Sequence, residues 1–134
     1  MRVVLDTNVV VSAVLLAGSV PRQAFDKALA EGTVLVSAPV VLELAEVLAR
    51  EKLNKYLTEE DQMRFLVALL KESELVEITE AVTDCRDAKD NKFLELGVSG
   101  RADYVVSGDR DLLALNPFRG IPILTPAQFL TVPS

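Results

Sequence analysis

The stretch VVLDTNVV (residues 3–10) joins an apolar run to a single carboxylate. The run is typical of a buried strand, and Asp6 stands where that strand would end. A charge at the edge of a hydrophobic core is costly unless it is paired, hydrogen-bonded or bound to a cation. Asp6 therefore needs a partner, and the rest of the chain indicates which kind.

Other apolar runs in the chain resemble the one that precedes Asp6. Together they predict five strands, at residues 2–6, 33–37, 75–78, 103–107 and 121–124. Helical periodicity fills the gaps, with clear helices expected at 21–32, 39–50 and 58–72. Nearly continuous apolar strands that alternate with helices are typical of a parallel sheet covered on both faces. We therefore expect a three-layer α/β/α sandwich that forms one domain over residues 1–134.

The composition excludes several classes of function. A net charge of −6 gives no basic surface for non-specific coating of nucleic acid. The absence of His excludes imidazole–zinc sites and Ser-His-Asp catalysis, and the single Cys85 cannot form an internal disulfide. Residues 1–19 lack the features of a signal peptide and no run is long enough to span a membrane, so we expect a cytoplasmic protein without membrane contact.

Four acids stand out by position. Asp6 and Asp109 follow the first and fourth predicted strands, and Asp90 opens a helical segment that leads into the fourth. Helical spacing places Glu43 at the border of the apolar stripe of its helix, whereas Glu46 points away from that stripe. Each acid also has a simpler interpretation, since Asp6, Asp90 and Asp109 could cap helices and Glu43 could be a solvated surface charge.

The four acids point to a binding site more clearly as a set than they do one at a time. In a parallel α/β sheet, ligands bind beyond the carboxyl ends of the strands, where the strand order reverses. If the order is 3-2-1-4-5, the ends of the first and fourth strands are neighbours and the four carboxylates converge. Unpaired carboxylates would repel one another, and a hard divalent cation such as Mg²⁺ or Mn²⁺ would relieve that repulsion.

Four blocks carry a family resemblance: VVLDTNVVVSAVL, PVVLELAEVLAR, DAKDNKFLELG and ADYVVSGDRDLLAL. In this order and spacing they resemble PIN-domain proteins, especially the VapC-like toxins of bacterial and archaeal toxin–antitoxin modules. The resemblance covers nearly the whole chain. It implies a PIN-like sheet of order 3-2-1-4-5, an endoribonuclease that uses Mg²⁺ or Mn²⁺, RNA as the substrate and a cognate antitoxin as a protein partner.

The resemblance also assigns roles to individual residues. It implies that the catalytic and metal-binding acids are Asp6, Glu43, Asp90 and Asp109, with supporting positions at Asn8 and Ser107. Asp87 and Asp111 rank second as the third and fourth acids. The RNA backbone would need local cations, for which the candidates are Arg22, Lys52, Lys89, Lys92, Arg101 and Arg110.

Two other functions remain open from the sequence. A haloacid-dehalogenase-like phosphotransferase also has an Asp at a strand end, although Asn8 stands where a second Asp is usual in that chemistry. A PIN-fold subunit without catalytic activity would act through binding alone. A homodimer or higher homo-oligomer is expected, because the helix at 58–72 has more apolar positions than one buried face needs: Met63, Phe65, Leu66, Val67, Leu69 and Leu70.

Overall fold

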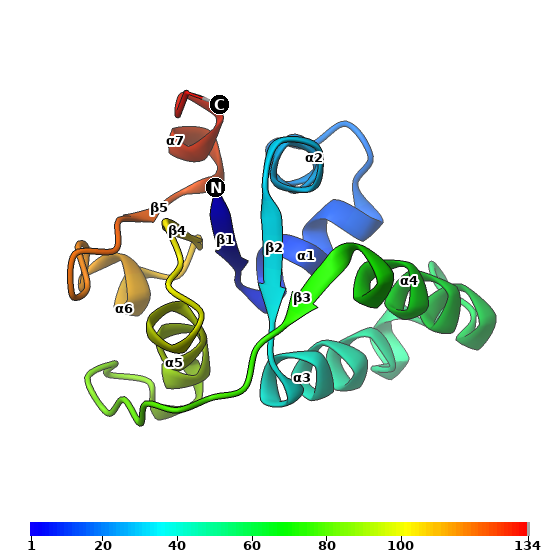
Figure 1. Ribbon diagram of the computed structural model, residues 1–134. Helices are drawn as coiled ribbons and strands as arrows, with labels where there is room; N and C mark the ends of the chain where they lie inside the picture. Colours follow the sequence, from blue (N-terminus) through cyan, green and yellow to red (C-terminus); the bar gives the residue numbers. More distant parts are fainter. Residues whose placement is uncertain (134) are drawn as a thin grey trace.

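The computed structural model describes residues 1–133, so the last residue of the expected domain, 134, lies outside the described part. Its centre is a five-stranded parallel sheet in the order β3-β2-β1-β4-β5 (Figure 1). The strands are β1 Arg2–Leu5, β2 Thr33–Val36, β3 Ser73–Leu75, β4 Tyr104–Val106 and β5 Ile123–Leu124. The expected α/β class and the strand order 3-2-1-4-5 are both confirmed.

The helices begin and end close to the start and stop signals in the sequence. They are α1 Thr7–Leu15, α2 Val20–Glu31, α3 Ala38–Leu48, α4 Glu59–Glu72, α5 Asn91–Ser99, α6 Arg110–Leu113 and α7 Pro126–Leu130, with short 3₁₀ helices η1 Glu51–Leu53 and η2 Ala88–Asp90. Thr58 begins α4 with a capping box that includes Asp61. Side chains of Ser19 and Ser37 accept hydrogen bonds from the first turns of α2 and α3. The three helices predicted most clearly thus lie within two residues of their expected bounds.

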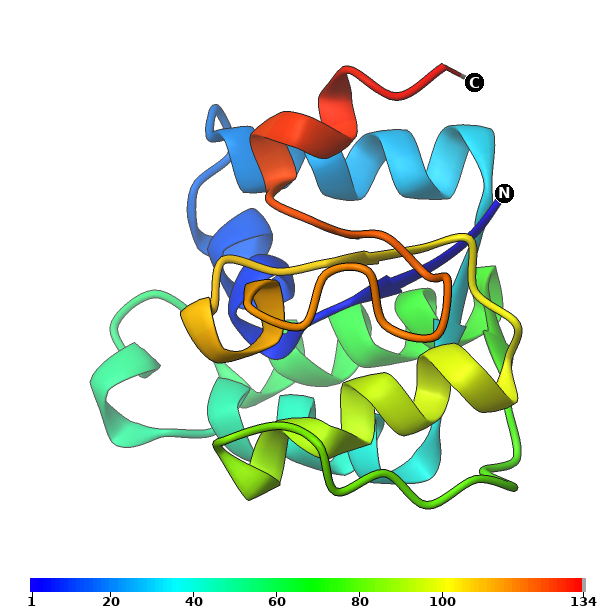
Figure 2. The ribbon, with the colours of Figure 1, turned by 90° about the vertical axis from the view of Figure 1, so that its left-hand side faces the viewer.

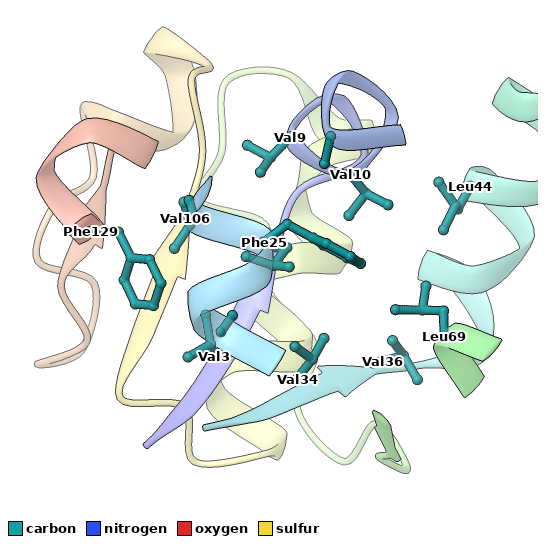
Figure 3. Close-up of a cluster of buried hydrophobic side chains, with 14 of the residues drawn as sticks. Val3, Val9, Val10, Phe25, Val34, Val36, Leu44, Leu69, Val106 and Phe129 are labelled. Carbon is teal, nitrogen blue, oxygen red and sulfur yellow. The ribbon is translucent and has the colours of Figure 1, made fainter. Parts of the chain in front are cut away.

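Alternation along each strand produces two hydrophobic layers. Val3 and Leu5 of β1 face α1 and α2 on one side of the sheet, whereas Val4 faces α5 on the other. The sheet is seen edge-on in Figure 2, with α2 and α7 above it and α3 and α5 below. Figure 3 shows the first layer, where Phe25 of α2 and Phe129 of α7 lie over the sheet. This three-layer packing covers the central strands on both faces, as the apolar runs predicted.

The third strand differs from its prediction. The apolar run at 75–78 was expected to form it, but β3 spans Ser73–Leu75, immediately after α4 ends at Glu72. The register is held by pairing of Val34 with Ser73 and by the Arg2 guanidinium, which donates to both Glu74 carboxylate oxygens at 3.0 and 2.5 Å. β3 is an edge strand with an exposed face, so polar residues form it and the hydrophobic pattern does not mark it.

Within residues 1–133, no single helix is both long and apolar enough to cross a membrane. The helices α1 and α2 pass on length and composition only when taken as a pair, and that pair is bent by 106°.

Candidate functional site

A cavity of about 660 Å³ opens at the carboxyl edge of the sheet. In Figure 2 the strands β1 and β4 run from right to left, and α1, α6 and η2 begin at the left-hand edge where those strands end. All four acids expected to act together line this cavity. Its described lining residues are Asp6, Thr7, Asn8, Glu43, Val47, Arg50, Asp87, Lys89, Asp90, Phe93, Gly108, Asp109, Arg110 and Asp111.

Asp6 lies between β1 and α1 and uses its two carboxylate oxygens differently. Oδ1 accepts a hydrogen bond from the Val9 backbone N–H at 2.8 Å and so caps α1, while Oδ2 accepts from the Ser107 hydroxyl. The residue is only 4% exposed. Burial raises the pKa of the Asp6 carboxyl, although the hydrogen bonds from Ser107 and Val9 oppose that shift. The capping interpretation of Asp6 is therefore correct, and the same side chain also lines the cavity.

Ser107 connects two of the acids from a fully buried position at the end of β4. Its hydroxyl donates to Asp6 and accepts from the Asp109 backbone N–H at 2.9 Å. The hydroxyl therefore fixes where the turn after β4 carries Asp109 relative to Asp6. The supporting position expected for Ser107 is consistent with this geometry.

The carboxyl groups of Asp90 and Asp109 lie close enough together for a hydrogen bond when Asp90 is protonated. Burial, this hydrogen bond and the charge of Asp109 raise the pKa of Asp90 to about 7. The same hydrogen bond lowers the pKa of Asp109. Asp109 also caps α6, because its Oδ1 accepts from the Asp111 N–H at 3.0 Å.

The capping interpretation fails for Asp90. Its side chain makes no capping hydrogen bond at the start of α5, although the residue is buried and only 7% exposed. A buried carboxyl that neither caps a helix nor pairs with a cation is costly, unless it binds a proton or a metal ion. The contact with Asp109 is therefore the feature of this site that local helix chemistry does not explain.

Glu43 extends from α3 to the cavity wall. Its Oε2 accepts a hydrogen bond from the Thr7 hydroxyl at 2.7 Å, and its Oε1 lies 3.4 Å from the ammonium of Lys92 on α5. The Glu43 side chain is 20% exposed, whereas Glu46 is exposed to solvent. The predicted difference between these two glutamates is confirmed.

The second-ranked acids also reach the cavity. Asp87 lines it from the start of η2, where its Oδ1 accepts from the Lys89 N–H at 3.3 Å. Asp111 lines it from α6. Asn8 is exposed on the same wall, at the second residue of α1. The cavity therefore holds six carboxylates, two more than the set expected to act together.

Three basic side chains balance part of this negative charge. Lys89 and Arg110 line the cavity as expected, and Arg50, which was not among the expected cations, also lines it. Arg50 lies two residues beyond the end of α3, where the backbone is extended before η1. The helix expected at 39–50 includes Arg50 seven residues after Glu43, and this spacing could have identified it. Thr7 was also overlooked, although it directly follows Asp6 in the quoted stretch.

The other basic candidates have different positions. Lys92 contacts Glu43 and lines a shallower depression beside the main cavity. Arg22 and Lys52 are not among the described residues that line the main cavity. Arg22 instead donates to the Ala13 carbonyl at 3.2 Å. Arg101 lies between α5 and β4, at the amino edge of the sheet and so opposite the carboxylates.

The donor set of the cavity fits a hard divalent cation, because it consists of carboxylate oxygens without imidazole or thiolate. In this arrangement, no three acidic, His or Cys side chains within residues 1–133 lie close enough to coordinate one ion. Asp6 faces Ser107, Asp90 faces Asp109, and Glu43 faces Thr7 and Lys92. Coordination of a cation would therefore require these side chains to exchange their present partners for the ion.

The chain is similar to known proteins both in sequence and in fold. A family model described as PIN domain matches residues 2–111. The uncharacterized protein MJ1680 of Methanocaldococcus jannaschii is 32% identical over 117 residues, which are 86% of this chain and 75% of that protein.

Two solved structures share the fold. One is VapBC2 from Rickettsia felis bound to a DNA fragment from their promoter, with TM-score 0.64 and 15% identity over 93% of this chain and 98% of that one. The other is PAE2754 from Pyrobaculum aerophilum, with TM-score 0.61 and 16% identity over 97% of this chain and 88% of that one. At these identities the structures establish the likeness of fold.

Proposed function

The chain belongs to the PIN domain family, and from that membership and the carboxylate cavity we propose that it is a metal-dependent ribonuclease. It would hydrolyse phosphodiester bonds of RNA with Mg²⁺ or Mn²⁺. The observation that carries this proposal is the convergence of four carboxylates on one cavity, among them Asp90 and Asp109, whose mutual repulsion a divalent cation could offset.

The residues that would hold the ion are Asp6, Glu43, Asp90 and Asp109. A bound Mg²⁺ or Mn²⁺ lowers the pKa of a coordinated water and stabilises the leaving oxygen of a phosphodiester. Ser107 would keep Asp6 and Asp109 at a constant separation, because its hydroxyl contacts both residues. Asn8, exposed on the cavity wall, would offer an amide to the substrate.

Substrate binding would depend on the cations of the cavity wall. With a net charge of −6 the protein repels a polyanion at long range, so attraction must be local. Arg50, Lys89 and Arg110 line the cavity beside the acids and could contact phosphates on either side of the scissile bond.

The proposal is tested by incubating purified protein with a panel of structured and unstructured RNAs in Mn²⁺, Mg²⁺ or EDTA. Cleavage should require the divalent ion and should disappear in the variant Asp6→Asn. The matched control is Asp84→Asn, which removes the charge of an exposed carboxylate outside the cavity wall and should cleave like the wild type. Metal-independent cleavage, or equal loss in both variants, would contradict the proposal.

The same experiment separates the alternatives. A folded protein that cleaves none of the RNAs in either metal would favour a binding subunit without catalysis. Phosphotransfer through an aspartyl phosphate would leave an acyl phosphate that can be trapped, which hydrolysis by an activated water does not form. Membership of the PIN domain family makes the haloacid-dehalogenase-like interpretation the weaker one.

We also propose that the protein is the toxin of a toxin–antitoxin pair in the cytoplasm, with a cognate antitoxin as partner. The VapBC2 complex, bound to a DNA fragment from its promoter, shares this fold and motivates the suggestion. Induced expression should then arrest growth, and co-expression of a small neighbouring reading frame should relieve the arrest. Growth that is unaffected by an RNA-cleaving wild-type protein would contradict the toxin role while leaving the ribonuclease proposal intact.

Self-association is the last part of the proposal. Leu69 of α4 is buried and Phe65 and Leu66 pack against the core. The remaining apolar side chains of the helix are exposed, by 63% for Met63 and by 44% each for Val67 and Leu70. Their spacing places them along one face of α4, which we propose as a contact between two copies of the chain.

A further inference from the structure

One basic residue contacts a carboxylate that the proposed function assigns to metal binding. Lys92 Nζ lies 3.4 Å from Glu43 Oε1. The two side chains are 22% and 20% exposed, so water screens this pair less than it screens the ion pairs of the outer surface. Lys92 therefore acts on the charge of Glu43 from the depression beside the main cavity.

The second oxygen of the same carboxylate is also occupied. Thr7, which is 7% exposed, donates its hydroxyl to Glu43 Oε2 at 2.7 Å. Three elements thus meet at one carboxylate: α1 through Thr7, α3 through Glu43 and α5 through Lys92. With a neutral donor on one oxygen and a cation on the other, Glu43 is held in place and its charge is compensated without a metal ion.

A divalent cation that uses Glu43 must share this carboxylate with Lys92. Coordination through Oε1 brings the ion close to the ammonium, and the repulsion between two cations at one oxygen weakens metal binding. The Thr7 hydroxyl is different, since it donates a neutral hydrogen bond that orients the carboxylate and can persist while the other oxygen coordinates.

We propose that Lys92 is a positioning residue that takes the place of the metal ion at Glu43 and competes with it. This inference rests on the proposed function, in which Glu43 is a metal ligand. Lys92 weakens metal binding. In the metal-free protein its charge offsets part of the repulsion between the acids of the site. Thr7 has the opposite effect and favours metal binding, because it holds Glu43 toward the cavity.

The test is a titration of the metal-free protein with MnCl₂, followed by calorimetry and by the metal-induced rise in melting temperature. Lys92→Met keeps the length of the side chain and removes its charge, and should lower the dissociation constant for Mn²⁺ by roughly three- to ten-fold. Lys92→Arg restores the charge and should bind Mn²⁺ like the wild type. Thr7→Val should bind Mn²⁺ more weakly than the wild type.

Lys89 supplies the matched control. It lines the same cavity, lies 3.7 Å from Asp87, and acts on the proposed ligands Asp90 and Asp109 through its charge alone. Lys89→Met removes one positive charge from the site without removing a contact to Glu43, so it should tighten Mn²⁺ binding clearly less than Lys92→Met does.

Two results would overturn the inference. In one, Lys92→Met binds Mn²⁺ no more tightly than the wild type, although circular dichroism shows that the variant is folded. In the other, Lys89→Met tightens binding as much, which would mean that only the overall charge matters. A wild-type protein that shows no saturable Mn²⁺ binding is a distinct result, because it contradicts the proposed function and this inference together.

Discussion

Ser107 donates its hydroxyl hydrogen bond to the carboxylate of Asp6, a residue 101 positions earlier in the chain. The contact joins the carboxyl ends of the neighbouring strands β1 and β4. The same hydroxyl accepts from the Asp109 N–H. This one buried oxygen therefore sets the spacing of two acids of the cavity, and both its donor and its acceptor function are used.

Replacement of Ser107 by Ala should destabilise the protein by about 1–3 kcal/mol, because the buried Asp6 carboxylate loses the hydroxyl donor to Oδ2 and the Asp109 N–H loses its acceptor. The control is Ser73→Ala. Ser73 Oγ is buried and makes no hydrogen bond within residues 1–133, so its removal should be neutral or slightly stabilising. Urea denaturation of both variants measures the difference, and equal effects would contradict this role of Ser107.

The variant Asp6→Asn should keep its fold and lose its metal response. Asn caps helices about as well as Asp, so the bond to Val9 can persist. Removal of one buried negative charge should leave the metal-free variant at least as stable as the wild type. Mn²⁺ should raise the melting temperature of the wild type and scarcely that of the variant, since a ligand stabilises only the state that it binds. Equal metal-induced shifts in both proteins would show that Asp6 is no ligand.

The Asp90 carboxyl should make stability depend on pH. Unfolded, it loses its proton near pH 4, whereas in the folded protein its pKa is about 7. The folded state then binds more protons between these values, so the free energy of unfolding should fall as pH rises from about 4 to about 7. The lowered pKa of Asp109 has the opposite effect, confined to pH below about 4.

Asp90→Asn should therefore flatten the stability profile between pH 4 and pH 7 and be at least as stable as the wild type at pH 8. The measurement is urea denaturation across this range in EDTA, so that no metal ion replaces the proton. A profile with the same slope in both proteins would mean that Asp90 does not hold the extra proton.

A charge on the exposed face of α4 should prevent self-association. Val67→Glu places a carboxylate at a 44% exposed apolar position, and light scattering should change from the mass of a dimer to that of a monomer. Leu16→Glu makes the same type of change at a 59% exposed residue outside α4, and should leave the mass unchanged. A wild-type monomer at high micromolar concentration would rule out the proposed contact.

Sequence patterns alone predicted the features of the fold that depend on neighbouring residues. Apolar runs and helix punctuation predicted four of the strands and the three clearest helices, because periodicity and capping act over a few residues. The same reasoning placed Asp6 and Asp109 just beyond the ends of β1 and β4 and distinguished Glu43 from Glu46. The third strand was misplaced, because an exposed edge strand does not need apolar residues.

Only the tertiary structure decided which side chains contact one another at the site. The sequence showed four acids at suitable positions, but not that Asp90 would lie against Asp109 rather than cap α5. It also did not show that Thr7 and Lys92 would meet at the Glu43 carboxylate. These contacts depend on the distance and orientation between elements that are far apart in the chain, and packing of both hydrophobic layers against the sheet sets that geometry.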